Sequence, residues 1–297
     1  MEDALVPARP RAPLRVPLVN VALLAATAAT TAFFGGAAFS AALIAILLTH
    51  EMGHWLYARR YGVDATLPYF IPIPFGVGTL GAVIRMRGAL PSRRAALDIG
   101  AAGPLAGFAV AVPLLVWGLA HSEVQVIAHA AVSSASSPAV AVWRMMQGLQ
   151  AFPVEAAEPY FGDSLLLLGA QRLVLGPLGP GEQVLIHPVG FAAWVGLLVT
   201  ALNLVPAGQL DGGHVLYALL GGRRARAAAR LVSHGLLLAG LFLSWSWLVW
   251  WVLSRFVVGL GHPPALVEEP LDARRRVVAW LSLVIFVLTF VPVPVSF

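Results

Sequence analysis

The sequence predicts an all-α polytopic membrane protein of about six or seven transmembrane helices with one membrane-inserted re-entrant loop or β-hairpin. Hydrophobic residues make up 59% of its 297 positions, charged residues make up only 11%, and the mean hydropathy is +0.82. A soluble domain carries about 25% charged residues, so this composition disfavours one. Several apolar runs have the length of about 17–25 residues that crosses a bilayer.

The first half of the chain is expected to begin with a disordered cytoplasmic tail, residues 1–17, which are rich in Pro and Arg. Residues 18–297 are then a single transmembrane domain. Its first two helices are predicted at Leu18–Phe34 and Ala38–Tyr57, with Gly35-Gly36 between them.

The next segment, residues 67–87, is apolar but contains three Pro and three Gly. Both residue types oppose a helix, and non-helical backbone at membrane depth must be covered by protein or line a cavity. We therefore predict a re-entrant loop or a short β-hairpin, the alternative being a surface loop.

The rest of the chain alternates apolar runs with one polar stretch. That stretch, residues 121–183, is predicted to be an external loop with amphipathic helices near Val140–Gln150 and Ser164–Leu175. C-terminal helices are expected within residues 225–297, where Ala225–Leu243 and Trp245–Val258 form one long helix or, by mild preference, a tight pair. The remaining apolar runs are Ala95–Ala120, interrupted by Gly103-Pro104, then Val184–Val205, the short helix Val215–Leu220, and Val277–Val295.

All 19 basic residues are Arg, and they flank the apolar runs. The positive-inside rule explains this placement better than nucleic-acid binding does. With the N-terminus in the cytoplasm, most of the arginines fall on the cytoplasmic side, and only Arg144 and Arg172 lie in the external loop. We expect a multi-pass protein of a bacterial or archaeal cytoplasmic membrane, with the lipid bilayer as its surroundings.

The second apolar run ends in His50-Glu51-Met52-Gly53-His54, an H-E-x-x-H motif. Histidines at i and i+4 lie on one face of a helix, where both rings reach one Zn²⁺, and the Glu stands beside the metal as a base. Ionised groups at membrane depth cost about 2.5–3.5 kcal/mol each on insertion scales, which a metal and a wet cavity would explain. The chain has no Cys, so a further ligand must be His, Asp or Glu.

Asp211 is the candidate for that ligand, because it is the only acidic residue between Glu182 and Glu268. Pro206 and Gly208 are expected to break the helix before it, and Gly212-Gly213 to turn the backbone sharply. The alternative interpretation of Asp211 is a plain helix N-cap. The H-E-x-x-H motif favours the ligand.

The two motifs together resemble the site-2 protease family of intramembrane zinc metalloproteases, in its short bacterial, archaeal and plastid-type branch. The resemblance covers about residues 38–220, the predicted core, and no stretch is long enough for a PDZ or paired CBS domain. The second motif reads N-x-x-P-x-x-x-L-D-G. The matching residues are His50, Glu51, His54, Asn203, Pro206, Leu210, Asp211 and Gly212.

The resemblance implies a metalloendopeptidase that hydrolyses a peptide bond within or near the transmembrane helix of a membrane-protein substrate. It implies one Zn²⁺ per chain on His50, His54 and Asp211, with Glu51 as the catalytic base and Asn203 lining the site. His214 is a possible neighbour of this ligand set. Gly107 stands where some members carry Asn, so the role of that Asn does not carry over.

The segment Gly76–Arg87 resembles the membrane-inserted strand of the same family, and a strand there would bind an unwound substrate by strand addition. The residues expected to hold the substrate are Gly78, Thr79, Leu80, Gly81, Ala82 and Val83.

Three alternatives remain open. A proteolytically silent zinc-binding homologue would not need Glu51, and a transporter with a metal site is disfavoured by the absence of internal repeats. Another membrane H-E-x-x-H peptidase would lack the N-x-x-P-x-x-x-L-D-G run.

Overall fold

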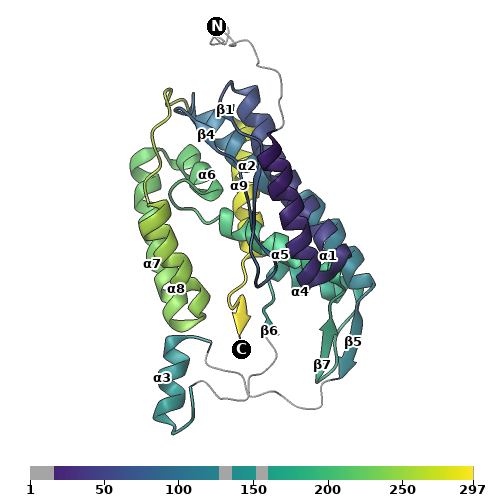
Figure 1. Ribbon diagram of the computed structural model, residues 1–297. Coiled ribbons are helices and arrows are strands. Elements are labelled where there is room, and N and C mark those ends of the chain that lie inside the picture. The colour runs from purple at the N-terminus through teal and green to yellow at the C-terminus, as the bar shows by residue number, and fades with distance from the viewer. Residues whose placement is uncertain (1–16, 127–135, 152–159, 297) are drawn as a thin grey trace.

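The computed structural model describes residues 17–126, 136–151 and 160–296, and the predicted tail lies almost wholly outside them. The described chain is mostly helical, as predicted (Figure 1). By length and composition, α1 and α2 are the two described helices that qualify as membrane spans. The helices are α1 (Leu18–Arg60), α2 (Arg93–Ala120), α3 (Pro138–Met146), α4 (Leu165–Val174), α5 (Pro188–Asn203), α6 (Asp211–Leu220), α7 (Gly222–Phe242), α8 (Trp245–Val252), the π-helix η1 (Leu253–Val258) and α9 (Ala273–Thr289).

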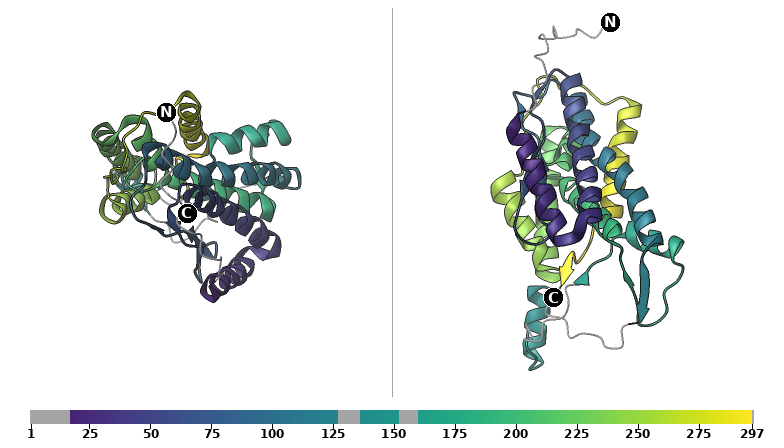
Figure 2. Two further views of the ribbon diagram at one scale, coloured as in Figure 1. Left: turned by 90° about the horizontal axis from the view of Figure 1, so that it is seen from above. Right: turned by 45° about the vertical axis from the view of Figure 1, so that its right-hand side comes forward.

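The element α1 is a hairpin of two helices rather than one rod. Gly36 has φ +82° and ψ 169°, which reverses the chain at the predicted Gly35-Gly36 break. The Ser40 hydroxyl consequently donates to the Ala28 carbonyl at 3.1 Å, although a straight helix would place these residues about 18 Å apart. Figure 2 shows the two halves side by side, which confirms the two predicted helices.

The Pro- and Gly-rich segment 67–87 forms a β-hairpin, one of the two forms predicted for it. Tyr69 pairs with Val83 and Phe70 with Ala82, and the register shifts before Pro72 meets Thr79. Four antiparallel pairs occur in the described chain. They join β1 (Asp64–Ala65) to β4 (Met86–Arg87), β2 (Tyr69–Pro72) to β3 (Thr79–Val83), β5 (Glu123–Val126) to β7 (Glu182–Leu185), and β6 (Tyr160–Phe161) to β8 (Val295–Ser296).

The structure contradicts one prediction about the helices and confirms another. The helix α2 continues through Gly103-Pro104, so the predicted interruption is wrong; Gly103 and Pro104 are buried, and the neighbouring helices support the backbone where Pro removes a helix hydrogen bond. The preferred tight pair is confirmed, because α7 ends at Phe242 and α8 returns against it, with Leu248 packed on Gly240. The amphipathic helices predicted in the polar stretch are α3 and α4.

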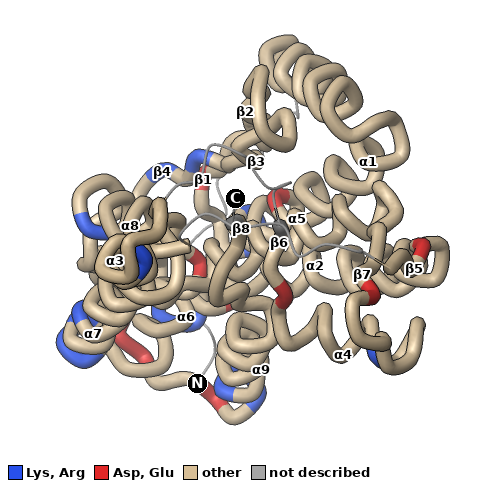
Figure 3. The backbone as a smooth tube through the Cα atoms, turned by 90° about the horizontal axis from the view of Figure 1, so that it is seen from below, with Lys and Arg blue, Asp and Glu red and all other residues tan. Residues whose placement is uncertain are grey.

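The main core lies between the second half of α1, α2 and α5, and includes Leu43, Ile46, Leu115 and Leu197. The C-terminal end of α1 and the N-terminal ends of α2, α7 and α9 lie at one end of the molecule (Figure 1). Arginines are concentrated on α7, on α9 and near β1 and β4 (Figure 3), whereas the β5–β7 pair and α3 lie at the opposite end.

Candidate metal centre

Three predicted ligands meet inside the helical core. His50 Nε2 and His54 Nε2 are 3.1 Å apart, and Asp211 Oδ2 lies 3.3 Å from the first and 3.2 Å from the second. Both histidines are buried, at 3% and 6% exposure. Within the described residues, these three form the set of His, Asp and Glu side chains close enough to share a metal ion.

The spacing of these atoms fits zinc. Bonds of about 2.0–2.1 Å in a tetrahedral shell separate neighbouring ligand atoms by about 3.3–3.4 Å, close to the distances found here. Two imidazole nitrogens and one carboxylate oxygen are also a donor set that catalytic zinc sites use, with the fourth position left for substrate or water. The site therefore fits the predicted cofactor.

The orientation of His54 is set by α2. Its Nδ1 lies 2.8 Å from the Ile99 carbonyl, which can only accept, so Nδ1 carries the proton. In the neutral ring Nε2 then has a free lone pair directed at the other two ligands. A metal-binding His ordinarily has such a partner on its second nitrogen, because the partner fixes the tautomer and the ring direction.

Glycines on α2 make room for both rings. A Cβ on Gly103 would lie 2.0 Å from His54 Nε2, and a Cβ on Gly107 would lie 3.2 Å from His50 Cβ and Nδ1. In the opposite direction, a Cβ on Gly53 would meet the Ala102 carbonyl oxygen at 2.5 Å. The two helices approach closely because these positions lack side chains.

Asp211 reaches the histidines from the start of α6. Leu210 is the residue before the first turn, so Asp211 is a helical residue and not the N-cap, and the alternative reading is wrong. The chain turns at Gly208, which has φ +56°. Gly212 does not turn the backbone as predicted; it allows close packing instead, since a Cβ there would lie 2.0 Å from the Leu204 carbonyl oxygen.

Asn203, the last residue of α5, also reaches the centre. Its Nδ2 lies 3.4 Å from His50 Nε2, so the predicted lining residue is next to a predicted ligand. His214 lies one turn beyond Asp211 and is buried, but its Nδ1 bonds to His262 Nε2 at 2.7 Å. The structure thus places His214 outside the set of three ligands.

Glu51 is buried at 6% exposure beside the ligand set, and it faces the strand segment. The backbone N–H of Ile84, just after β3, is directed toward its carboxylate. The next N–H, of Arg85, points the other way and donates to Thr66 Oγ1 at 3.0 Å. Alternation along a strand therefore directs one edge of this segment toward the centre.

The residues predicted to hold substrate differ in their burial and in their hydrogen-bond partners. Thr79 is buried, and its hydroxyl donates to the Ile71 carbonyl at 3.0 Å, so that side chain serves the hairpin itself. Gly78 packs against the Thr31 backbone. Leu80 and Val83 are exposed at 67% and 51%. No other described strand pairs with the second edge of β3.

Sequence reasoning missed three partners of the site: the Ile84 N–H, the Ile99 carbonyl and His262. The first two are backbone groups, which no residue type reveals. His262 stands 48 positions from His214 and has no motif spacing to it.

Comparison with known proteins places these residues in a family. Residues 38–246 match the family model described as Peptidase family M50. The "Probable zinc metalloprotease EGY2, chloroplastic" of Arabidopsis thaliana is 30% identical over 257 residues, which cover 85% of this chain and 40% of that protein. The "Probable zinc metalloprotease EGY1, chloroplastic" of Oryza sativa subsp. japonica is 32% identical over 84% of this chain and 39% of its own length. The chain thus spans about two fifths of these relatives. No solved structure matches it.

Proposed function

Because the chain belongs to peptidase family M50, the site-2 protease family that its motifs resembled, we propose that it is an intramembrane zinc metalloendopeptidase. It hydrolyses a peptide bond within or near the transmembrane helix of a membrane-protein substrate. The observation that carries this proposal is the meeting of His50, His54 and Asp211 within 3.3 Å of one another, with Glu51 buried next to them.

The residues of the chain divide the chemistry as follows. His50, His54 and Asp211 hold one zinc ion, which when bound supplies Lewis acidity toward water and the scissile carbonyl. Glu51 takes a proton from the attacking water and later gives it to the leaving amine. The Asn203 amide is within reach to donate a hydrogen bond to the carbonyl oxygen as negative charge develops there.

The helical arrangement supports the predicted topology. The α7–α8 pair returns the chain, so the arginines at positions 223–230 and 274–276 share one end with those at 59–60 and 93–94. We assign that end to the cytoplasm, with the N-terminus there, in a bacterial or archaeal membrane. Residues 18–297 form one domain with a core at 38–220. Six or seven spans then surround the site, and the hairpin of segment 67–87 is inserted from one side.

Substrate binds as an added strand on the free edge of β3. Val83 pairs with Tyr69 of β2, whereas Ile84 directs its N–H toward Glu51. By alternation Ala82 shares the direction of Ile84, so the Ala82 backbone groups and the Ile84 carbonyl are offered to an unwound substrate, while the Ile84 N–H stays with Glu51. A substrate held there lies beside the proposed base.

The test uses Glu51→Gln and a reporter transmembrane segment incubated with purified protein in vesicles. The variant should keep its zinc and its fold, and cleavage should drop by about 10²–10⁴-fold because the proton acceptor is gone. Glu123→Gln, at an exposed position on β5, is the matched control and should cleave normally. Zinc binding without cleavage by the wild type on any reporter would favour the silent homologue. Near-normal cleavage by Glu51→Gln would reject the assigned base.

A Pro scan from Thr79 to Ile84 tests the strand. Pro removes one backbone donor, so Ala82→Pro and Ile84→Pro should reduce cleavage while zinc content is kept. Ala82→Gly, which keeps the N–H, is the control. A flat profile, in which every folded variant cleaves normally, would leave the hairpin as a lid or spacer.

A further inference from the structure

The segment between η1 and α9, residues 259–272, crosses over α6 and is called the strap here. It lies outside the residues that match the family model. Its backbone is tied to the start of α2, since Leu266 N–H donates to the Leu90 carbonyl at 3.0 Å and Val267 N–H to the Pro91 carbonyl at 3.1 Å. In return, Arg93 N–H donates to the Val267 carbonyl at 3.1 Å. These backbone hydrogen bonds fix the strap against the start of α2.

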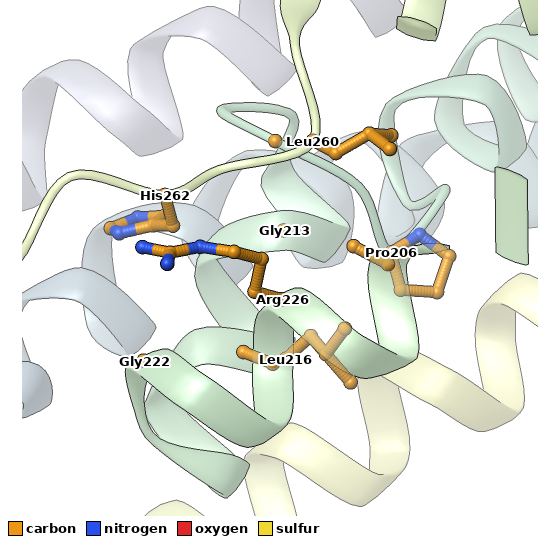
Figure 4. A pocket seen from close by; sticks show the side chains of 10 residues that line it. Pro206, Gly213, Leu216, Gly222, Arg226, Leu260 and His262 are labelled. Carbon is orange, nitrogen blue, oxygen red and sulfur yellow. The ribbon is translucent and has the colours of Figure 1, made fainter. Parts of the chain in front are cut away.

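Side chains of the strap contact one face of α6. His262 Nε2 lies 2.7 Å from His214 Nδ1, and the His262 ring stacks on Tyr217 with centroids 4.1 Å apart and an interplanar angle of 10°. The Tyr217 hydroxyl accepts from Ala265 N–H at 2.7 Å and donates to Glu268. Figure 4 shows His262 reaching from the strap, with Arg226 of α7 extending alongside it.

The hydrogen bond between the two histidines has a defined direction in their neutral forms. His262 Nδ1 lies 2.6 Å from the Pro263 carbonyl, which only accepts, so Nδ1 carries the proton and Nε2 is the acceptor. His214 Nδ1 then donates to it. The buried His214 ring is enclosed from the other side by α2, where a Cβ on Gly100 would lie 2.5 Å from His214 Cβ.

These contacts bracket Asp211. Three residues after it, His214 bonds to the strap; three residues before it, Gly208 packs so closely that a Cβ there would lie 2.1 Å from the Gly259 carbonyl oxygen. The helix α6 has only ten residues and no side-chain cap. A helix that short does not hold its own position, so its tertiary contacts decide where its first residue points.

We propose that His262 is a positioning residue for the metal centre, which acts through His214 to hold the Asp211 carboxylate at the two histidines. Ligand groups must stay within about 0.5 Å of their productive positions, so a small shift of α6 weakens the site. This inference rests on the metal centre of the proposed function. It adds a residue that no motif and no family match assigns.

The experiment compares His262→Phe, which keeps a ring on Tyr217 but has no acceptor for His214, with His262→Gln, which keeps an acceptor. Both are purified as full-length protein in detergent. Zinc affinity is measured by chelator competition, and Co²⁺ is loaded in place of zinc so that its visible absorption reports the ligand geometry. His234→Phe is the control, because His234 is exposed on α7 and its one bond within the described part of the chain is to the Arg230 carbonyl of its own helix.

His262→Phe should bind zinc about 10-fold to 100-fold more weakly and change the cobalt spectrum, as losses of such supporting residues do. His262→Gln should restore most of the affinity, and His234→Phe should match the wild type. A merely structural role would lower the thermal unfolding temperature of metal-free and zinc-loaded protein equally and leave the spectrum unchanged.

Wild-type affinity and spectrum in folded His262→Phe would overturn the proposal. Should that variant not fold, His214→Leu removes the same hydrogen bond from the α6 side, and an unchanged affinity there has the same consequence. His54→Ala separates the two hypotheses: if it keeps tight zinc, the metal centre itself is wrong, whatever His262 does.

Discussion

Replacing Gly103 with Ala tests the close packing between α2 and the helix that carries the histidines. The added Cβ would lie 2.0, 2.4 and 2.6 Å from His54 Nε2, Cδ2 and Cε1. Real Cβ atoms essentially never come closer than 3.0 Å to such a neighbour, so the ring must withdraw by about 1 Å. Zinc sites tolerate ligand distances within about ±0.2 Å, so His54 stops being a ligand.

Loss of a residue that only supports a ligand weakens metal binding by about 10-fold to 100-fold. Gly103→Ala should weaken zinc binding by more than this, because it displaces a ligand itself. Cleavage of the reporter should become undetectable. Gly107→Ala, whose Cβ would lie 3.2 Å from His50 Cβ and Nδ1, should have a milder effect. Gly235→Ala in α7 meets nothing within 4 Å and should stabilise the protein by about 0.5–1 kcal/mol.

Metal analysis, chelator competition and thermal unfolding on the three variants form a graded series. The loss of zinc affinity should be larger the shorter the distance from the added Cβ to its nearest neighbour. Gly103→Ala that holds zinc with wild-type affinity and cleaves normally would refute this account of the packing and, with it, the assigned place of the His54 ring.

Further predictions concern the metal centre and the arginine-rich end of the molecule. Asp211→Ala should lose most of its zinc because two ligands remain, and equally tight binding would remove Asp211 from the ligand set. Arg275 binds Asp98 through Nε and Nη2 at 2.8–3.1 Å. Arg275→Met should therefore lower the free energy of unfolding by about 1.5–3 kcal/mol, and an unchanged value would contradict this. Burial, together with a hydrogen bond to Asp98, raises the pKa of Tyr61 from 10 to about 12. The raised pKa means that the protonated Tyr61 stabilises the folded state. This contribution to the free energy of unfolding is present below pH 10 and is lost as the pH rises toward 12. Tyr61→Phe should therefore flatten the fall in the denaturation midpoint at alkaline pH.

The sequence alone predicted the features that depend on local spacing and composition. Histidines four residues apart share a helix face whatever surrounds the helix, so His50 and His54 were identified as a pair. Apolar runs, the Gly35-Gly36 break and the Pro- and Gly-rich segment 67–87 likewise follow from the chain itself, because bilayer length and backbone freedom are local constraints.

Only the tertiary structure decided which distant groups meet at the centre. The Ile99 carbonyl orients His54 and the Ile84 N–H faces Glu51, and a backbone group carries no sequence signal. The continuity of α2 through Pro104 depends on the helices packed around it. His262 joins His214 because the chain returns over α6, and a contact between residues 48 positions apart is set by the path of the chain rather than by any periodicity along it.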